Sequence, residues 1–304
     1  MKNKKATKHE QDPTGQYANR KKAFRDITTR LNNANKRALK LWQNIDAKKT
    51  TRKKVVNEKL DFYLYDLTSF DLEQVKREIE TIINEENETD MFLIPFLWFY
   101  KSYLEIAMRS GVIQESSWIN TIIPRPLLSF DSILSSQKYN DLLTKAFNNN
   151  YSSLKSLSEK TIKQVFDVIN RGIESGASKS SIRRDITKRF QVAKSAAKRI
   201  VETEINKAYN DARMETISQQ INAGAPLAVQ HISALLATTR PHHAIRHGKA
   251  YTPQQQLNWW NQGSNRINCK CTTRSIVVNN DGTVKNKSAQ NIVIKRGRDW
   301  FNSD

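Results

Sequence analysis

The chain has 304 residues, 38% of them hydrophobic, and its 50 Lys and Arg residues against 30 Asp and Glu residues give a net charge of +20. This length is enough for two domains with a sizeable apolar core. The two cysteines, Cys269 and Cys271, exclude a disulfide framework and favour a reducing compartment. The longest apolar run, "MFLIPFLWFY" at 91–100, contains Pro95 and is too short for a membrane span, and no export signal follows the basic N-terminus.

The positive charge is unevenly distributed along the chain. Residues 1–60 carry a net charge of +13, residues 61–150 carry −7, residues 151–222 carry +6 and residues 223–304 carry +8. An excess of this size is typical of proteins that contact a polyanion, and it predicts binding to double-stranded DNA without sequence specificity. The acidic middle of the chain predicts contact with a different partner, a protein.

The N-terminal half has the apolar periodicity of helices. After a basic arm at residues 1–22, which we expect to be flexible, apolar residues at alternating spacings of four and three predict a helix from Ile27 to Ile45. A capping pattern at Asp71 begins a second, acidic helix, and a third is expected from Phe92 to a stop at Gly111. The polar run "NNNYSS" near residue 150 predicts a loop and a domain boundary.

The C-terminal half changes from helical to strand periodicity. One helix is expected to close at Gly176, a second restarts after it behind a Ser cap, and a third, long helix ends near Gly224. "APLAVQHISALL" and "CKCTTRSIVVNNDGTVKNK" then predict strands, the latter a hairpin that turns at Asp281-Gly282. The pair Trp259-Trp260 is typical of a core plug, with stacking on bases as the alternative.

These elements predict a mainly α-helical fold with a small α+β C-terminal domain. The N-terminal half is helical, and a helical hairpin leads into a short-stranded, irregular unit. The expected segments are the arm at 1–22, a helical N-terminal domain at 23–150, a C-terminal domain at 151–277, and a hairpin end with a C-terminal tail at 278–304.

Three sequence elements follow one another in an order that resembles a known family. They are "GASKSSIRRDITKRF", "AAKRIVETEINKAYNDAR" and "TTRPHHAIRHGKAY" with its sequel "INCKC". Together they are similar to the phage head morphogenesis family, the minor head proteins similar to the F protein of phage Mu, over about residues 160–277. The matching positions are Gly176, Ser178, Thr203, Glu204, Asn210, Ala212, Arg213, Arg240, His243, Gly248, Cys269 and Cys271. The chain departs from the family pattern at Leu236, Thr238 and Lys270.

The resemblance implies a minor head protein of a tailed phage, carried in the virion interior near the portal vertex. Its implied role is in head morphogenesis and in packaging or ejecting DNA. The implied partners are the double-stranded phage genome, the portal protein and a scaffold or capsid protein, with assembly in the host cytoplasm. The positive ends of the chain agree with contact to packaged DNA. The candidate DNA contacts are Arg20, Lys21, Lys22, Arg183, Arg184, Lys188, Arg266 and Lys270.

Four side chains predict a metal site. His243 and His247, spaced i and i+4, share one face of a short helix, and Cys269 and Cys271 share one side of a strand. Two nitrogens and two sulfurs make a tetrahedral set that suits a structural zinc ion.

The same residues have a simpler interpretation. The cysteines can be small buried side chains and His243 a hydrogen-bonded packing residue, and His231 and His242 compete as ligands. The sequence leaves this interpretation and the metal site both open.

A catalytic role for Arg240 and His243, as in a phosphodiester hydrolase, is a further alternative. The region beyond residue 223 has three acidic residues, which provide neither a two-carboxylate metal cluster nor a Ser/His/Asp set. We therefore expect no enzyme activity and name no catalytic residue. A nuclease-type toxin and a free, non-specific DNA-binding protein are the alternative functions.

Overall fold

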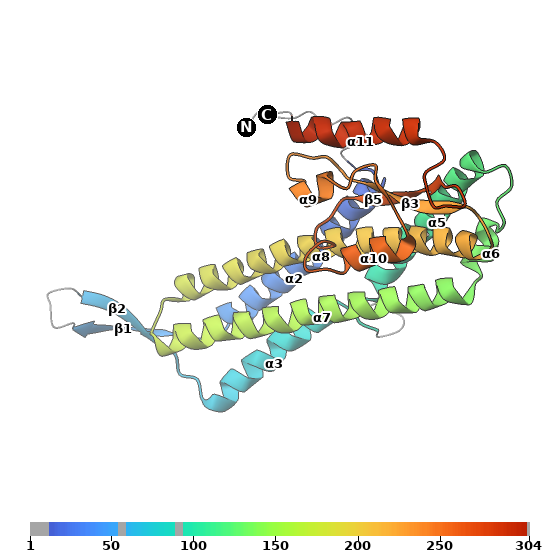
Figure 1. The fold of residues 1–304 in the computed structure, drawn as a ribbon. Helices are drawn as coiled ribbons and strands as arrows, with labels where there is room; N and C mark the ends of the chain where they lie inside the picture. The colour runs from blue at the N-terminus through green and yellow to red at the C-terminus, as the bar shows by residue number, and fades with distance from the viewer. Residues whose placement is uncertain (1–11, 54–58, 89–93, 303–304) are drawn as a thin grey trace. The chain divides into compact units, whose positions relative to one another are not determined.

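The computed structural model describes residues 12–53, 59–88 and 94–302, with the backbone alone for residues 48–62 (Figure 1). Most of these residues are helical, and the strands form one two-stranded and one three-stranded antiparallel sheet. The expected fold class, mainly α with a small α+β region near the C-terminus, is confirmed. Among the described helices, none is both long enough and apolar enough to cross a membrane.

The chain groups into two compact units built from alternating segments. Three long helices, α2 (Tyr17–Gln43), α7 (Gln137–Glu174) and α8 (Lys179–Asn222), contribute residues to both units. The boundary near residue 150 and the four expected segments stay predictions. Unit 1 consists of Met1–Lys22, Phe99–Asn148 and Val201–Asp304, and unit 2 consists of Ala23–Trp98 and Asn149–Ile200.

The polar run "NNNYSS" is helical, so the loop expected there is wrong. α7 continues through it, because Asn150 and Leu154 are both buried and tertiary packing stabilises a stretch of weak helix formers. α8 is also one helix where two were expected. Gly176, with a φ of 64°, follows the end of α7, and the Ser178 hydroxyl accepts a hydrogen bond from the Ser181 amide at the start of α8.

Only part of the basic arm expected at residues 1–22 lies within the described residues. Residues 1–11 lie outside the described residues. From Tyr17 onward the arm is the first part of α2, and Arg20 within it is 2% exposed. The expectation of a flexible arm therefore does not extend to these helical residues.

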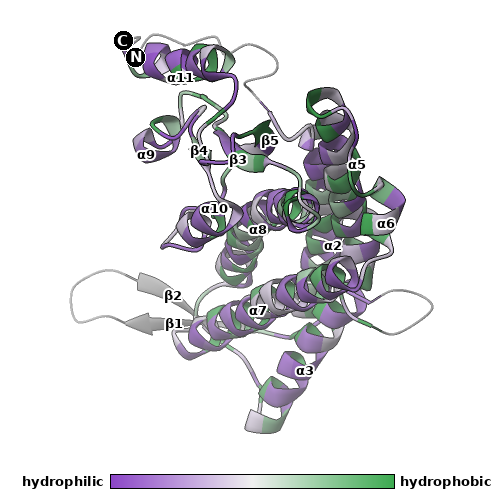
Figure 2. Ribbon diagram, turned by 45° about the vertical axis from the view of Figure 1, so that its right-hand side comes forward, coloured by the Kyte–Doolittle hydropathy of each residue, from purple (hydrophilic) through white to green (hydrophobic). Residues whose placement is uncertain are grey.

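An apolar core holds the described part of unit 2 together. α3 (Ser69–Glu85) begins at a capping box in which Thr68 and Asp71 bond each other's backbone amides, so the cap lies three residues before the expected one. The core joins apolar faces of α2, α3, α7 and α8, which Figure 2 shows as alternating hydrophobic and hydrophilic bands along α7 and α8. Its buried members are Ala34, Ala38, Trp42, Ile45, Val75, Ile79, Ile82, Ile83, Val165, Val168, Ile169, Ile182, Ile186 and Phe190.

A short hairpin in unit 2 was not predicted. β1 (Lys48–Lys53) pairs with β2 (Lys59–Leu64) in antiparallel register, with Lys48 opposite Leu64 and Lys53 opposite Lys59. The first strand, "KKTTRK", has no apolar residue, so it lacks the alternation from which a half-buried strand is recognised.

The helix expected to stop at Gly111 continues beyond it. α4 (Leu97–Phe99), the π-helical segment η1 (Tyr100–Leu104) and α5 (Glu105–Ile122) follow one another without a break, and α6 (Phe130–Leu134) comes next. Gly111 is buried inside α5, where a Cβ atom would overlap the carbonyl oxygen of Tyr209 in α8. This glycine therefore allows close approach of two helices in unit 1 rather than ending one of them.

The sheet of unit 1 has the order β4-β3-β5. β3 (Leu227–Ile232) pairs with β4 (Ala250–Tyr251) and with β5 (Thr272–Val277), where Leu227 lies opposite Val277. Val229 of β3 packs with Met214 and Ile217 of α8 and with Trp260, the last residue of α10 (Pro253–Trp260). Trp260 is 2% exposed, which agrees with the core plug expected for the tryptophan pair.

The end of the chain differs from the expected hairpin and tail. The Asp281-Gly282 turn is present, but the second strand is reduced to a single bridge between Val278 and Val284. Residues beyond it form α11 (Lys287–Asn302), whose backbone lies against Gly248, where a Cβ atom would be 2.6 Å from the Ile294 amide nitrogen. The motif glycine therefore has a packing role, in addition to its φ of 80°.

We predict that Gly111→Ala destabilises the protein. Helix propensity alone would make this change stabilising by about 1 kcal/mol, but the overlap with the Tyr209 carbonyl reverses the sign to a loss of about 1–3 kcal/mol. Chemical denaturation measures the free energy of unfolding. Asn120→Ala, at an exposed position of the same helix, is the control and should change it by less than about 0.5 kcal/mol. A more stable Gly111→Ala protein would contradict this account of α5.

Candidate metal centre

Two asparagines of α8 hold the segment that carries both cysteines. Asn206 donates a hydrogen bond to the Cys269 carbonyl (2.8 Å), and Asn210 donates to the Cys271 carbonyl (3.0 Å). The two asparagines are four residues apart and therefore share one face of the helix. The Asn210 side-chain oxygen also accepts from the Thr272 hydroxyl (2.7 Å), at the start of β5. The motif position Asn210 thus fixes the backbone of the cysteine segment.

His243, Cys269 and Cys271 converge in the interior of unit 1. His243 lies on α9 (Pro241–Ala244), which begins with the expected proline. Its Nδ1 atom is 3.4 Å from the Cys271 sulfur and 3.5 Å from the Cys269 sulfur, and the three candidate ligand atoms all lie within 4.8 Å of one another. All three side chains are buried. One nitrogen and two sulfurs are ligands that zinc prefers, so the cluster could bind a metal ion.

The two thiols influence each other's ionisation. A hydrogen bond from Cys271, followed by the interaction with His243, lowers the pKa of Cys269 well below its usual value. The same bond to Cys269, together with burial, raises the pKa of Cys271 well above its usual value. The contact between the two thiols therefore favours loss of the proton from Cys269 over loss from Cys271. A divalent cation would compensate the charge of a second thiolate, which is how a metal site deprotonates its cysteines.

The fourth expected ligand, His247, is not part of this cluster. α9 ends at Ala244, so the helical face expected to align His243 and His247 is not continued. The Nδ1 atom of His247 instead accepts a hydrogen bond from the Ser233 amide at 3.0 Å. Ser233, which the sequence did not single out, also lies beside the cluster, since its hydroxyl is 3.6 Å from the Cys271 sulfur.

The two competing histidines have other partners. His231 is fully buried, its Nδ1 atom lies 3.1 Å from the side-chain nitrogen of Gln256, and burial with the nearby Arg246 charge lowers its pKa well below the usual value. His242 is exposed and bonds the Asn265 side chain at 3.0 Å. Neither belongs to the group of ligand atoms around His243.

Arg240 supports a loop. Its guanidinium donates to the carbonyl oxygens of Ser264 (2.6 Å), Asn265 (3.0 Å) and Ile267 (3.3 Å), which precede the cysteine segment. Arg240 also lines a pocket of about 110 Å³ beside His243 and both cysteines. The pocket gives a fourth metal ligand, such as a water molecule, a place to enter.

Three further motif positions on α8 have different surroundings. The Thr203 hydroxyl accepts a hydrogen bond from the Asn268 amide (3.0 Å), next to Cys269. Glu204 is half-buried on α8. Arg213 is buried and bonds both Glu115 of α5 and the Tyr209 hydroxyl (2.8 Å). These contacts give the motif a structural role.

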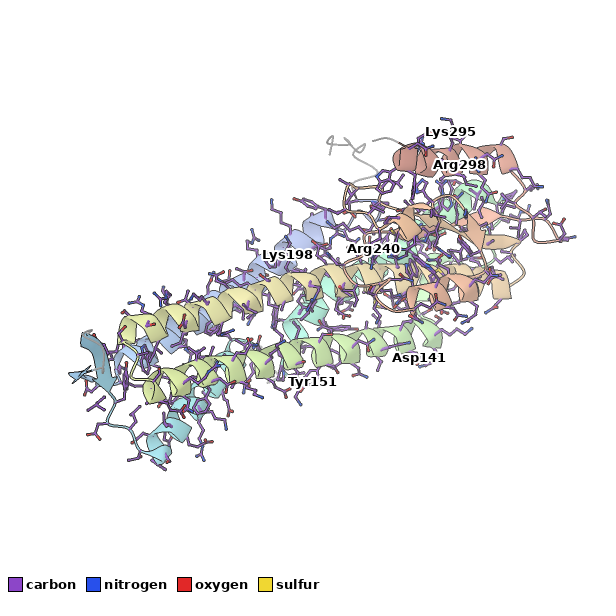
Figure 3. All side chains as sticks on the ribbon, turned by 60° about the vertical axis from the view of Figure 1, so that its left-hand side comes forward. Asp141, Tyr151, Lys198, Arg240, Lys295 and Arg298 are labelled. Atoms are coloured by element: carbon purple, nitrogen blue, oxygen red, sulfur yellow. The ribbon has the colours of Figure 1, made fainter. Side chains whose placement is uncertain are left out.

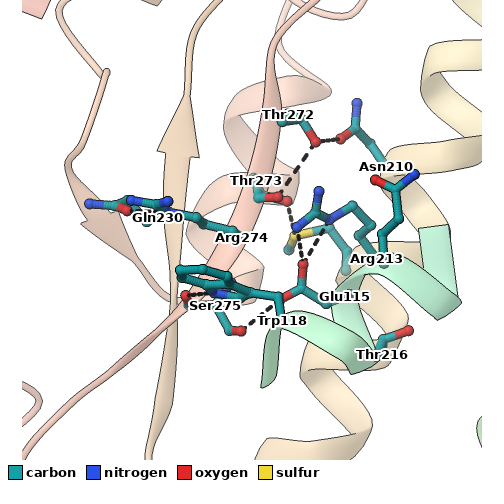
Figure 4. Close-up of polar contacts among 12 residues, drawn as sticks. Glu115, Trp118, Asn210, Arg213, Thr216, Gln230, Thr272, Thr273, Arg274 and Ser275 are labelled. Carbon is teal, nitrogen blue, oxygen red and sulfur yellow. Dashed lines mark hydrogen bonds and ion pairs between the residues drawn. The ribbon is translucent and has the colours of Figure 1, made fainter. Parts of the chain in front are cut away.

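Glu115 is the main residue that the sequence analysis missed. It has no exposed surface, and one carboxylate oxygen accepts from Arg213 Nε (2.7 Å) and Nη2, while the other accepts from the Ser275 amide (2.8 Å) and hydroxyl (2.6 Å) (Figure 4). The Ser275 carbonyl in turn accepts from the Trp118 indole (2.8 Å). Glu115 thereby connects α5, α8 and β5. Its partners are 98 and 160 residues away in sequence, so no local pattern indicates them.

Three of the eight expected DNA contacts are buried or half-buried and lie beside acidic residues. Arg20 is 2% exposed and pairs with Asp12 (3.2 Å) and Glu202 (3.1 Å), so its inclusion was wrong. Arg266 pairs with Asp211 (2.5 Å), and Lys270 lies 4.0 Å from Glu202. The remaining five are exposed: Lys21, Lys22, Arg183, Arg184 and Lys188.

Comparison with known proteins finds one family that is similar to part of the chain. Residues 163–274 match the model of a family described as phage Mu protein F like protein, which confirms the expected resemblance over that segment. Such a family suggests a phage head morphogenesis protein. The matched segment contains His243, both cysteines and Arg213, and leaves Glu115 and α11 outside. Searches of curated proteins and of solved structures give no match to the chain.

We predict that Glu115→Ala lowers the free energy of unfolding by about 3–5 kcal/mol, because it leaves the buried Arg213 charge without its carboxylate. The double variant Glu115→Leu/Arg213→Met removes both charges and should recover most of that loss. The control is Asp299→Ala, which breaks the exposed pair with Lys295 and should cost less than about 1 kcal/mol. Equal losses in the buried and exposed variants, measured by denaturant unfolding, would contradict a central role for the Glu115–Arg213 pair.

Proposed function

We propose that this protein is a minor head protein of a tailed phage, held in the virion interior near the portal vertex. In this role it binds packaged DNA without sequence specificity and acts in head morphogenesis, DNA packaging or DNA ejection. Its protein partners are then the portal protein and a scaffold or capsid protein. The family match over residues 163–274 supports the head-protein part of the proposal, and the surface of α8 supports the DNA contact.

The observation that carries the DNA contact is the charge of the first half of α8. Residues 179–200 contain eight Lys and Arg residues and one acidic residue, Asp185, which gives a net charge of +7. Asp185 is engaged by Lys188 (2.9 Å) and Arg184 (3.9 Å). Figure 3 labels Lys198 on the same helix, and its side chain is exposed, as are those of Arg183, Arg184, Lys188 and Arg199.

The part of α7 that lies in the same unit lacks this excess of positive charge. Residues 149–174 of α7 have four Lys and Arg residues and three acidic residues, a net charge of +1. A row of exposed cations with one acidic neighbour binds duplex phosphates by releasing their counterions, and this binding needs no contact to bases. The α8 segment therefore suits non-specific contact with densely packed DNA.

We propose a structural rather than a catalytic role for the His-Cys cluster. Hydrolytic chemistry at a metal needs a group that accepts a proton from water, commonly a carboxylate. The pocket beside the cluster is lined by ten residues, none of them Asp or Glu. A zinc ion held by His243, Cys269 and Cys271 would cross-link α9 to the segment before β5. A nuclease-type toxin, the enzyme alternative, predicts growth arrest in expressing cells that His243→Ala relieves.

We predict that Arg183→Ala/Arg184→Ala/Lys188→Ala reduces duplex DNA binding and its salt dependence. Each lost phosphate contact lowers the slope of log K against log salt by about 0.9, so the triple variant should lower it by about 2–3. Fluorescence anisotropy with labelled duplexes of unrelated sequences measures both quantities.

The matched control for this test is Lys155→Ala/Lys160→Ala/Lys163→Ala, which removes three exposed charges from α7 in the same unit. The slope of log K against log salt for this control should change by less than about 0.9, the value for one phosphate contact. If the two triple variants lose the same affinity, net charge rather than the α8 surface governs DNA binding.

We predict that the protein purified from zinc-supplemented cells contains about one zinc ion per chain. Cys269→Ser should lose this ion, and cobalt substitution should give a sulfur-to-metal charge-transfer absorption that the variant lacks. His242→Gln changes an exposed neighbouring histidine outside the cluster and should retain the metal. Elemental analysis checks the content, and equal zinc content in Cys269→Ser and the unsubstituted protein would contradict the site.

A further inference from the structure

A cationic cleft lies in unit 1, and none of the three clustered residues His243, Cys269 and Cys271 lines it. It consists of two pockets of about 770 and 660 Å³ that share Trp118 and Arg274 in their walls. We name the two pockets together the Trp118 cleft. Volumes in this range are typical of sites for small-molecule ligands. Arg213 is the one motif position in the walls of the cleft, and the proposed DNA contact on α8 does not account for the cleft.

The walls of the Trp118 cleft are positively charged. Arg274, Lys285 and Lys287 line the larger pocket, and Arg274, Arg213 and Arg296 line the smaller one. No Asp or Glu is among the residues that line either pocket. Positive groups concentrated in a concave, partly dehydrated wall attract an anion more strongly than the same groups on an open surface.

The Glu115 carboxylate pairs with Arg213 but makes no hydrogen bond to Arg274. Glu115 interacts with the charge of Arg274, but its two oxygens are already bonded to Arg213 and to Ser275. Burial, and then the like charges of Arg213 and Arg296, lower the pKa of Arg274. A bound anion would therefore stabilise the positive charge of Arg274.

Arg274 is held in a fixed orientation. Its Nε atom donates a hydrogen bond to the Gln230 side chain (2.8 Å), and its guanidinium carbon lies 4.9 Å from the centre of the Trp118 ring (Figure 4). The indole is itself fixed by its bond to the Ser275 carbonyl. In the part of the chain that the structure describes, no group accepts a hydrogen bond from the two Nη atoms of Arg274. Two donors of a fixed arginine fork are thus free to bind a phosphate.

We propose that the Trp118 cleft binds a phosphate ester that is joined to a nucleobase, as in a free nucleotide or a single DNA strand. Arg274, Lys285 and Lys287 would bind the phosphates, and Trp118 provides the aromatic surface on which bases stack. This goes beyond the proposed head function, because the α8 surface needs duplex phosphates alone and belongs to the other unit.

The test measures binding of ATP, and of a short single-stranded oligonucleotide, to the full-length protein by calorimetry. Lys285→Glu/Lys287→Glu reverses two exposed charges of the cleft without disturbing buried contacts. It should weaken nucleotide binding about tenfold or more. Arg274→Gln should have a similar effect. The matched control, Lys138→Glu/Lys145→Glu, makes the same charge change at exposed positions of α7 in unit 1 and should leave affinity unchanged within about twofold.

The outcomes separate the two sources of the ligand from failure of the proposal. ATP binding that depends on the cleft residues identifies a free nucleotide, and cleft-dependent binding of the oligonucleotide alone identifies a DNA strand. Equal weakening by the cleft and control variants, or no binding of either ligand, overturns the proposal, as does cleft-dependent binding of an oligoglutamate peptide alone. The α8 triple variant should lose duplex affinity and keep nucleotide binding, so failure of the proposed DNA contact is distinguishable.

Discussion

The buried carboxylate of Glu115 requires a counter-charge and hydrogen-bond donors inside unit 1. Glu115 has no contact with solvent, and a buried charge is tolerated only when it is paired and its oxygens are hydrogen-bonded. Arg213 of α8 provides the counter-charge, and Ser275 of β5 donates hydrogen bonds to the other carboxylate oxygen. The helix that carries Glu115, the long motif helix and the edge of the sheet are therefore fixed together by a single side chain. Gly111, on the same helix as Glu115, permits the close approach to α8 that this pairing needs.

The motif residues extend this arrangement from α8 to the cysteine segment. Arg213 binds the carboxylate, Asn210 and Asn206 bind the carbonyls of the cysteines, and Thr203 accepts from the next loop amide. Positions three or four apart on one helix thus contact successive parts of one loop. The His-Cys cluster lies where this loop meets α9. Thr203 and Asn210 of the motif therefore hold backbone groups of the cysteine segment, as Asn206 does outside the motif. Arg213 instead holds the Glu115 side chain.

The sequence predicted what depends on local pattern. The spacing of apolar residues predicted α2 and β3, and the metal-binding residue types predicted that His243 lies near the two cysteines. The sequence did not predict features that depend on contacts between residues far apart in the chain. Helix propensity did not predict α7 through Asn150, because that residue is stabilised by burial, and charge alone did not distinguish the buried Arg20 from exposed lysines. The Glu115–Arg213 pair spans 98 residues and has no local signature.

The proposed function requires that this chain is a component of a phage head. Quantitative mass spectrometry of purified full particles, compared with particles that have ejected their genome, determines whether the chain is present in the head. We expect the chain to be present in full particles. Depletion from emptied particles would show that it leaves with the DNA, and retention would show that it stays as a vertex component. Absence of the chain from both kinds of particle would contradict the proposed function.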